Sequence, residues 1–302
     1  MTNVKTLTIE QTNRALSRKR RMGKIQKILA NVFIYFVLVL MYAPLMYITI
    51  FSFTSSKATG TWTDFTFSNY TTLFDSNNVY AQKIWSAAGN TILVAITAAA
   101  FSTILGTLGA IGIYYTRRKW IKNSLDFMTQ IPVVNAEIVT AVSLCVLFVL
   151  TARFLPRSFV TLVIGHTVLS IPYVVMSVKP KLEQMDPSLY EAAMDLGATQ
   201  TQSLFKVIIP DIIPGILSGF LLSITLSLDD YVITAFTKPT SGGFDTISTY
   251  VDAATRKSGL PTQLRAFTAI LFAVILIVMI GMNIKSSRNA KMLIKKEKNK
   301  ND

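Results

Sequence analysis

The stretch EAAMDLGATQTQSLFKVIIP, residues 191–210, is polar and helix-forming, yet it lies between long apolar segments of the chain. Directly before it, Asp186 and Pro187 form a strong helix start, because Asp caps free backbone amides and Pro is tolerated at the first helical position. Gly197 is placed to end this helix, since glycine enters the left-handed conformation freely. The stretch therefore predicts a short helix that ends at a glycine turn.

A second helix is expected after the glycine. Thr199 and Gln202 have the spacing of a capping box for it, and we expect it to run to Pro210. The first helix carries one apolar stripe at helical spacing, formed by Leu189, Ala192, Ala193 and Leu196. Alanines on this stripe allow close approach either by a partner protein or by the chain's own helices, and both interpretations stay open. We call residues 186–210 the helix–turn–helix unit.

The apolar segments around this unit are long enough to cross a membrane. The chain has 302 residues, of which 51% are hydrophobic and 15% charged, and a mean hydropathy of +0.45. That profile is typical of a polytopic membrane protein, and a spanning helix needs about 20 mostly apolar residues. The sequence predicts an all-α membrane protein with about six spans and with the unit between the fourth and fifth. The expected spans are 29–53, 87–115, 124–150, 158–178, 209–228 and 264–284.

The second expected span carries small residues at close spacing. Helices in lipid associate through close backbone approach, which small residues permit. We therefore predict a helix-packing face, and not a phosphate-binding loop, at Ala95, Ala98, Ala99, Gly106, Gly109 and Gly112.

The basic residues predict how the chain is oriented. The formal net charge is +14, and 22 of the 30 Lys and Arg residues fall on one side of the membrane if both termini are cytoplasmic. We expect a multi-pass protein of the cell membrane with basic cytoplasmic tails at 1–28 and 285–302 and a transmembrane domain at 29–284. The tails are expected to touch anionic lipid headgroups. Nucleic-acid binding is not expected.

The helix–turn–helix unit resembles the EAA loop of binding-protein-dependent ABC importer permeases. The pattern of that loop is Glu-Ala-Ala, three residues, Gly, nine residues, then Ile-x-Leu-Pro. Val207 and Ile209 are conservative replacements for its Ile and Leu. Identity and spacing match at Glu191, Ala192, Ala193, Gly197 and Pro210. In that family the loop is the coupling helix that docks into a cleft of the cytoplasmic ATPase, so the resemblance implies the same role here.

The resemblance extends over about residues 30–284. Within the family, SLDDYVITAF after the fifth span and IPVVNAEIV in the third look like PotC-type spermidine/putrescine permeases. The resemblance implies three partners: a cytoplasmic ABC ATPase dimer (PotA-like), a second permease (PotB-like) and an external polyamine-binding protein (PotD-like). The chain has no GxxxxGK[ST] phosphate loop. It is therefore expected to be a non-catalytic subunit without a cofactor, with ATP and Mg bound by the partner ATPase.

Ionisable residues at membrane depth suggest a route for a cation, because such residues are costly there and face the bundle interior or a water-filled cavity. Glu137 is expected half-way along the third span. Asp229 and Asp230 are expected at the outward end of the fifth, where the helix dipole is negative. We hypothesise that these carboxylates line the path of a polyamine. Tyr231 and Phe236 could add cation–π contacts to its ammonium groups.

Structural roles compete with this hypothesis. Asp229 and Asp230 could cap or hydrogen-bond at the interface, and Glu137 could pair with a Lys or Arg of the partner permease. His166 in the fourth span is more often a satisfied helix-packing residue than a ligand or a proton relay.

Other functions are weighed against the leading one. A permease of this type could carry another small solute, such as a metal ion, an anion or an opine, although the carboxylates argue against an anion. A stand-alone channel or secondary carrier often shows inverted internal repeats, and the sequence has no evident repeat. An intramembrane protease would need two Asp on facing spans, or a Ser placed near His166, and no such motif stands out.

Overall fold

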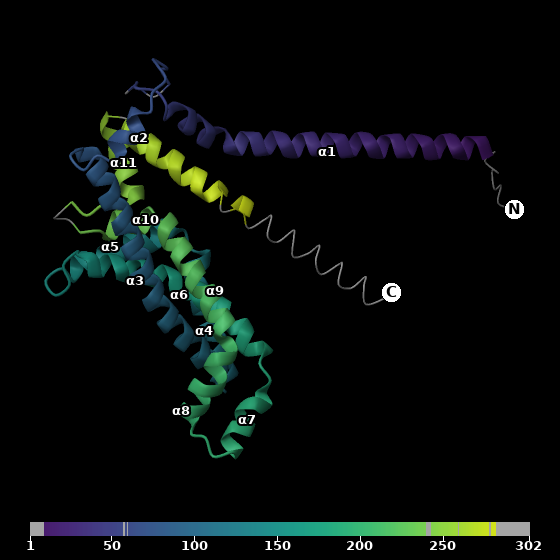
Figure 1. Cartoon of the computed structure of the whole chain (residues 1–302). Helices are drawn as coiled ribbons and strands as arrows, with labels where there is room; N and C mark the ends of the chain where they lie inside the picture. The colour runs from purple at the N-terminus through teal and green to yellow at the C-terminus, as the bar shows by residue number, and fades with distance from the viewer. Residues whose placement is uncertain are drawn as a thin grey trace. The chain divides into compact units, whose positions relative to one another are not determined.

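The computed structural model describes residues 9–56, 58, 60–239, 243–258, 260–277 and 279–281. Every regular element within these residues is a helix, as predicted (Figure 1). The chain divides into two compact units. One comprises Met1–Phe74 with Pro261–Asp302, and the other is Asp75–Leu260.

The first unit contains α1 (Ile9–Phe51), α2 (Ser68–Leu73) and the last span, Thr262–Gly281. The apolar part of α1 that could cross a membrane is Gln26–Phe51, close to the predicted first span. Because α1 begins at Ile9, the described part of the predicted N-terminal tail is helical and continues into the span. The predicted C-terminal tail, 285–302, lies outside the described residues.

The second unit is built on three long helices that pack side by side, α3 (Val79–Tyr115), α6 (Phe159–Gln184) and α9 (Ile209–Asp229) (Figure 1). Ser102 of α3 and Ser223 of α9 form a buried hydrogen bond of 2.6 Å between their hydroxyl oxygens. The predicted small-residue face of α3 lies inside this bundle, where Ala95, Ala98 and Ala99 are fully buried or nearly so. The three helices therefore form the frame that positions the site.

The third predicted span is not one straight helix. It consists of α4 (Lys119–Val134) and α5 (Glu137–Leu150), which meet at an angle of 102°. Pro132 lacks an N–H group and weakens the last turn of α4, and Asn135 and Ala136 then adopt extended backbone angles. Counted as one bent span, this pair brings the candidate spans of the described chain to six. Glu137 lies near the middle of this bent pair, as expected, and is the first residue of α5.

The remaining elements lie at the two ends of the bundle. At one end are α10 (Val232–Thr237), which contacts α5 and α6, and α11 (Ile247–Ser258), which contacts α3. At the opposite end are α7 (Pro187–Asp195), α8 (Gln200–Ser203) and the π-helical turn η1 (Leu204–Ile208) (Figure 1).

The second helix of the helix–turn–helix unit does not end at Pro210. The segment Gln200–Asp229 is continuous, because α8 passes through η1 directly into α9. A proline has no N–H to donate, and its ring crowds the carbonyl four residues earlier. The wider π turn, in which the N–H of Ile209 donates to the carbonyl oxygen of Leu204, gives Pro210 room.

Candidate functional site

The start of α7 is capped as the sequence predicts. The side chain of Asp186 accepts a hydrogen bond of 2.9 Å from the backbone N–H of Ser188. This backbone donor stabilises the charged carboxylate and lowers the pKa of Asp186 below its usual value. The first turn of the unit is therefore fixed by its own side chain.

The end of α7 is a two-bond glycine cap. Gly197 has φ +85, and its N–H donates to the carbonyl oxygen of Met194 at 2.9 Å. The next N–H, of Ala198, donates to the carbonyl oxygen of Ala193 at 3.0 Å. The capping box predicted for the second helix is also present, with both of its hydrogen bonds between Thr199 and Gln202. The predicted end of the first helix and the predicted start of the second are thus confirmed.

The apolar stripe of α7 is not used for packing inside the described chain. Leu196 is 90% exposed and Leu189 is 46% exposed. Glu191 and Ala192 are exposed as well, and Ala193 is half-buried. The unit is instead held to the bundle by Met185, Tyr190, Leu204 and Ile208, which join one apolar cluster. Of the two interpretations left open by the sequence, the exposed stripe favours a surface for a partner.

At the other end of the bundle, three carboxylates meet at one cavity. It has a volume of about 190 Å³ and lies between the α4–α5 bend, α6 and the end of α9. We call it the acidic cavity because Glu137, Asp229 and Asp230 all line it. The other lining residues are Pro132, Val133, Asn135, Leu169, Tyr173 and Leu226. The bend is what brings Glu137 here, since it turns the start of α5 toward the end of α9.

Asp230 is anchored, whereas Glu137 and Asp229 are exposed. The carboxylate of Asp230 accepts hydrogen bonds from the backbone N–H of Ile233 at 3.0 Å and of Thr234 at 2.8 Å. It also accepts one from the hydroxyl of Thr234 at 2.9 Å. Asp230 therefore has the capping role that was one alternative, and it lines the acidic cavity as well.

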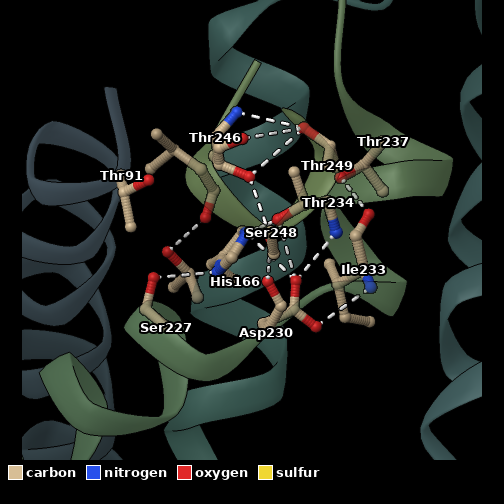
Figure 2. Close-up of polar contacts among 12 residues, drawn as sticks. Thr91, His166, Ser227, Asp230, Ile233, Thr234, Thr237, Thr246, Ser248 and Thr249 are labelled. Carbon is tan, nitrogen blue, oxygen red and sulfur yellow. Dashed lines mark hydrogen bonds and ion pairs between the residues drawn. The ribbon is translucent and has the colours of Figure 1, made fainter. Parts of the chain in front are cut away.

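His166 lies behind Asp230 and is fully partnered. Its Nε2 is 2.9 Å from the hydroxyl of Thr234, and its Nδ1 is 2.8 Å from the hydroxyl of Ser227. Nε2 is also 3.5 Å from the carboxylate of Asp230. Figure 2 shows the imidazole between Ser227 on one side and Asp230 with Thr234 on the other. The interpretation of His166 as a satisfied packing residue is thus confirmed.

Two of the predicted path residues are not brought to the acidic cavity. Phe236 packs against the apolar cluster of α5, α6 and α10. Tyr231 interacts instead with the side chains of Asp252 and Arg256 on α11. Tyr173 of α6 is the aromatic residue that lines the cavity instead. The sequence analysis did not predict Tyr173 as a site residue, because the residues that face it across the cavity come from other helices.

Glu137 has no cationic partner within the part of the chain that the structure describes. Its electrostatic neighbours are the two other carboxylates of the acidic cavity, Asp229 and Asp230. The alternative that Glu137 pairs with a basic residue of a partner permease therefore stays a prediction.

Comparison with known proteins places this arrangement among transport proteins. Residues 102–288 match the family described as "Binding-protein-dependent transport system inner membrane component". The putrescine transport system permease protein PotI of Escherichia coli (strain K12) is 32% identical over 242 residues, covering 79% of this chain and 83% of that protein. The spermidine/putrescine transport system permease protein PotC of the same strain is 29% identical over 257 residues, covering 85% and 93%.

A solved structure agrees with the fold. A chain in the crystal structure of a bacterial ABC transporter involved in the import of the acidic polysaccharide alginate matches with a TM-score of 0.60. The match covers 88% of this chain and 97% of that one at 18% sequence identity. At this identity the likeness concerns the arrangement of the helices.

Proposed function

The chain belongs to the family of binding-protein-dependent transport system inner membrane components, and on this premise we propose that it forms, with a second permease subunit, the translocation path for a polyamine. The relatives named for putrescine and spermidine transport, at 32% and 29% identity over most of the chain, support this substrate class. The chain is a multi-pass membrane subunit of a transport system, and the polyamine is the finer proposal.

The observation that carries the proposal is the meeting of three carboxylates at one cavity. Glu137, Asp229 and Asp230 come from two parts of the chain and share the acidic cavity with Leu169 and Leu226. A polyamine carries ammonium groups separated by apolar methylene segments. Its charged groups suit the carboxylates, and its methylene groups suit the apolar part of the lining.

The charge balance of the cavity supports a cation over an anion. Carboxylates that share a site repel one another, and a nearby positive charge relieves this repulsion. Glu137 and Asp229 are exposed, whereas Asp230 is buried and accepts hydrogen bonds from the start of α10. The arrangement therefore combines one buried, hydrogen-bonded carboxylate with two exposed ones.

The exposed stripe of α7 supports a role in coupling. We propose that a cytoplasmic ABC ATPase dimer (PotA-like) docks on α7, and that it binds the ATP and Mg while this chain holds no cofactor. An external polyamine-binding protein (PotD-like) would deliver the substrate, and the second permease would be PotB-like. This arrangement places both termini and α7 in the cytoplasm, in agreement with the distribution of Lys and Arg.

The substrate proposal is tested by uptake of labelled putrescine and spermidine in cells that lack other polyamine importers and that express the complete transporter. We expect Glu137→Gln and Asp229→Asn each to lower uptake about tenfold, because each removes one charge from the acidic cavity. The matched control is Asp211→Asn, which removes an exposed carboxylate at the far end of the same α9 helix.

Two outcomes would contradict this proposal. No polyamine uptake by the wild-type complex would remove the substrate assignment and direct the search to other small cations. Polyamine uptake that is unchanged in both cavity variants, with normal assembly, would leave Glu137 and Asp229 with structural roles only.

A further inference from the structure

Behind the acidic cavity, a chain of hydrogen bonds crosses three helices. It runs from Ser227 of α9 to His166 of α6, then to Thr234 of α10, and ends at the carboxylate of Asp230 (Figure 2). Its links measure 2.8, 2.9 and 2.9 Å. All four residues are at most 5% exposed. Burial requires each of these polar groups to have a partner, and here the partners lead to a carboxylate that lines the acidic cavity.

The direction of each hydrogen bond follows from the number of protons. The hydroxyl of Thr234 has one proton, and the carboxylate of Asp230 can only accept it. The Nε2 atom of His166 must then carry the proton that it shares with Thr234. The buried hydroxyl of Ser227 donates to Nδ1, which is its hydrogen-bond partner in the described chain. The chain of donors thus points from Ser227 toward Asp230.

The carboxylate at the end of this chain has one acceptor position left. A carboxylate offers about four lone-pair positions, and Ile233 N–H, Thr234 N–H and the Thr234 hydroxyl take three of them. The same carboxylate lines the acidic cavity and interacts with Glu137 there. A donor that enters the cavity can take the remaining position in place of this interaction with Glu137.

We propose that His166 and Thr234 are positioning residues, which hold the carboxylate of Asp230 so that it presents its free acceptor position to a cation in the acidic cavity. This inference rests on the proposed transport function and assigns a specific task to residues outside the cavity lining. A carboxylate that is already oriented does not have to be ordered when the ligand binds, which improves affinity. Removal of the hydroxyl of Thr234 leaves Asp230 with fewer constraints on its orientation.

The transport test compares conservative and disruptive replacements of the same residue. Thr234→Ser keeps the hydroxyl, whereas Thr234→Val removes it at nearly the same size. His166→Gln keeps one donor and one acceptor, whereas His166→Leu keeps neither. We expect the disruptive variants to raise the KM for polyamine about tenfold with a maximal rate within about twofold of the wild type. The conservative variants should remain within about threefold of the wild-type KM.

The control for a buried hydroxyl is Thr167→Val. Thr167 lies one residue from His166 on α6, and its hydroxyl donates only within that helix, to the carbonyl oxygen of Val163. The KM of the Thr167→Val variant for polyamine should match that of the wild type. Equal KM values for Thr234→Val and Thr234→Ser would overturn the proposal.

A second measurement does not depend on transport. His166 is the only histidine among the 302 residues, so protein labelled with ¹⁵N-histidine and purified without a histidine tag gives a single imidazole signal. We expect the tautomer with the proton on Nε2 in the wild type and in Thr234→Ser, and a changed Nε2 signal in Thr234→Val. A proton on Nδ1 instead of Nε2 in the wild type would overturn the proposal. Absence of polyamine uptake by the wild type would contradict the proposed function alone, since the spectrum is recorded without substrate.

Discussion

At the scale of single residues, glycines determine how closely the helices of the bundle approach. A Cβ atom added to Gly106 of α3 would lie 2.7 Å from Cβ of Val174 on α6 and 3.2 Å from the carbonyl oxygen of Ile171. Gly112 has nothing within 4 Å of such an atom, so it does not contribute to the packing face that the sequence predicts. The predicted small-residue face therefore exists on α3, but Gly112 at its predicted end is not part of it.

Gly106→Ala is expected to destabilise the bundle by about 1–3 kcal/mol, because the neighbouring backbone at Ile171 cannot move aside without shifting α6. The measurement is thermal unfolding in detergent. Gly89→Ala is the matched control, since it lies on the same α3 helix and an added methyl group meets nothing within 4 Å. Equal melting temperatures for the two variants would contradict the close contact between α3 and α6.

Single residues also mark the limit of the sequence analysis. The cost of charge at membrane depth was enough to select Glu137, Asp229 and Asp230, and the structure places all three at one cavity. It was not enough to place Tyr231 or Phe236, since neighbours along a chain need not face the same cavity. The meeting of His166 with Thr234 and Asp230 depends on how three helices pack, which a single sequence does not encode locally.

At the scale of elements, the local signals were the most reliable. The ends of α7 depend on Asp186 and Gly197 alone, and the structure has both caps where the sequence predicts them. The two prolines were harder to interpret. Pro132 accompanies a bend of 102° between α4 and α5, whereas Pro210 is accommodated by a π turn without a break. A proline removes one hydrogen bond in each case, and the surrounding packing decides how the backbone adapts.

The helix–turn–helix unit gives a prediction at this scale. Gly197→Ala introduces a side chain at φ +85, which costs about 1–2 kcal/mol and loosens the end of α7. Glu191→Ala removes an exposed charge and should leave the fold unchanged. We expect both variants to lower ATP-driven uptake at least about threefold while membrane insertion remains normal. The measurement is uptake together with recovery of the ATPase on the purified permease.

The control for this experiment is Thr201→Ala on α8, which changes an exposed residue outside the matched pattern. Normal ATP-driven uptake in both Gly197→Ala and Glu191→Ala would remove the coupling role from the unit.

At the scale of the whole molecule, the second unit keeps the acidic cavity apart from the exposed stripe of α7. Helix α7 lies at one end of the bundle (Figure 1), whereas the acidic cavity is lined by Asp229 at the end of α9 and by Leu169 and Tyr173 in the middle of α6. From Tyr173, which lines the cavity, to Gln184 at the end of α6, the helix rises about 17 Å. Both α6 and α9 reach the cavity with residues that line it, and both continue into the helix–turn–helix unit at their other end. The long helices α6 and α9 therefore connect the helix–turn–helix unit to the acidic cavity.

The coupling proposal requires α7 to lie on the cytoplasmic side of the membrane, which cysteine labelling tests. Cys145 is the only cysteine of the chain, so Cys145→Ser gives a background for single cysteines at two exposed positions, Asn77 before α3 and Thr201 on α8. A membrane-impermeant maleimide should label the Asn77→Cys variant in intact cells. It should label the Thr201→Cys variant only after the cells are permeabilised. Six alternating spans and the excess of Lys and Arg on the side of the termini both predict this result. The reverse labelling would place α7 outside the cell, where no ATPase could dock on it.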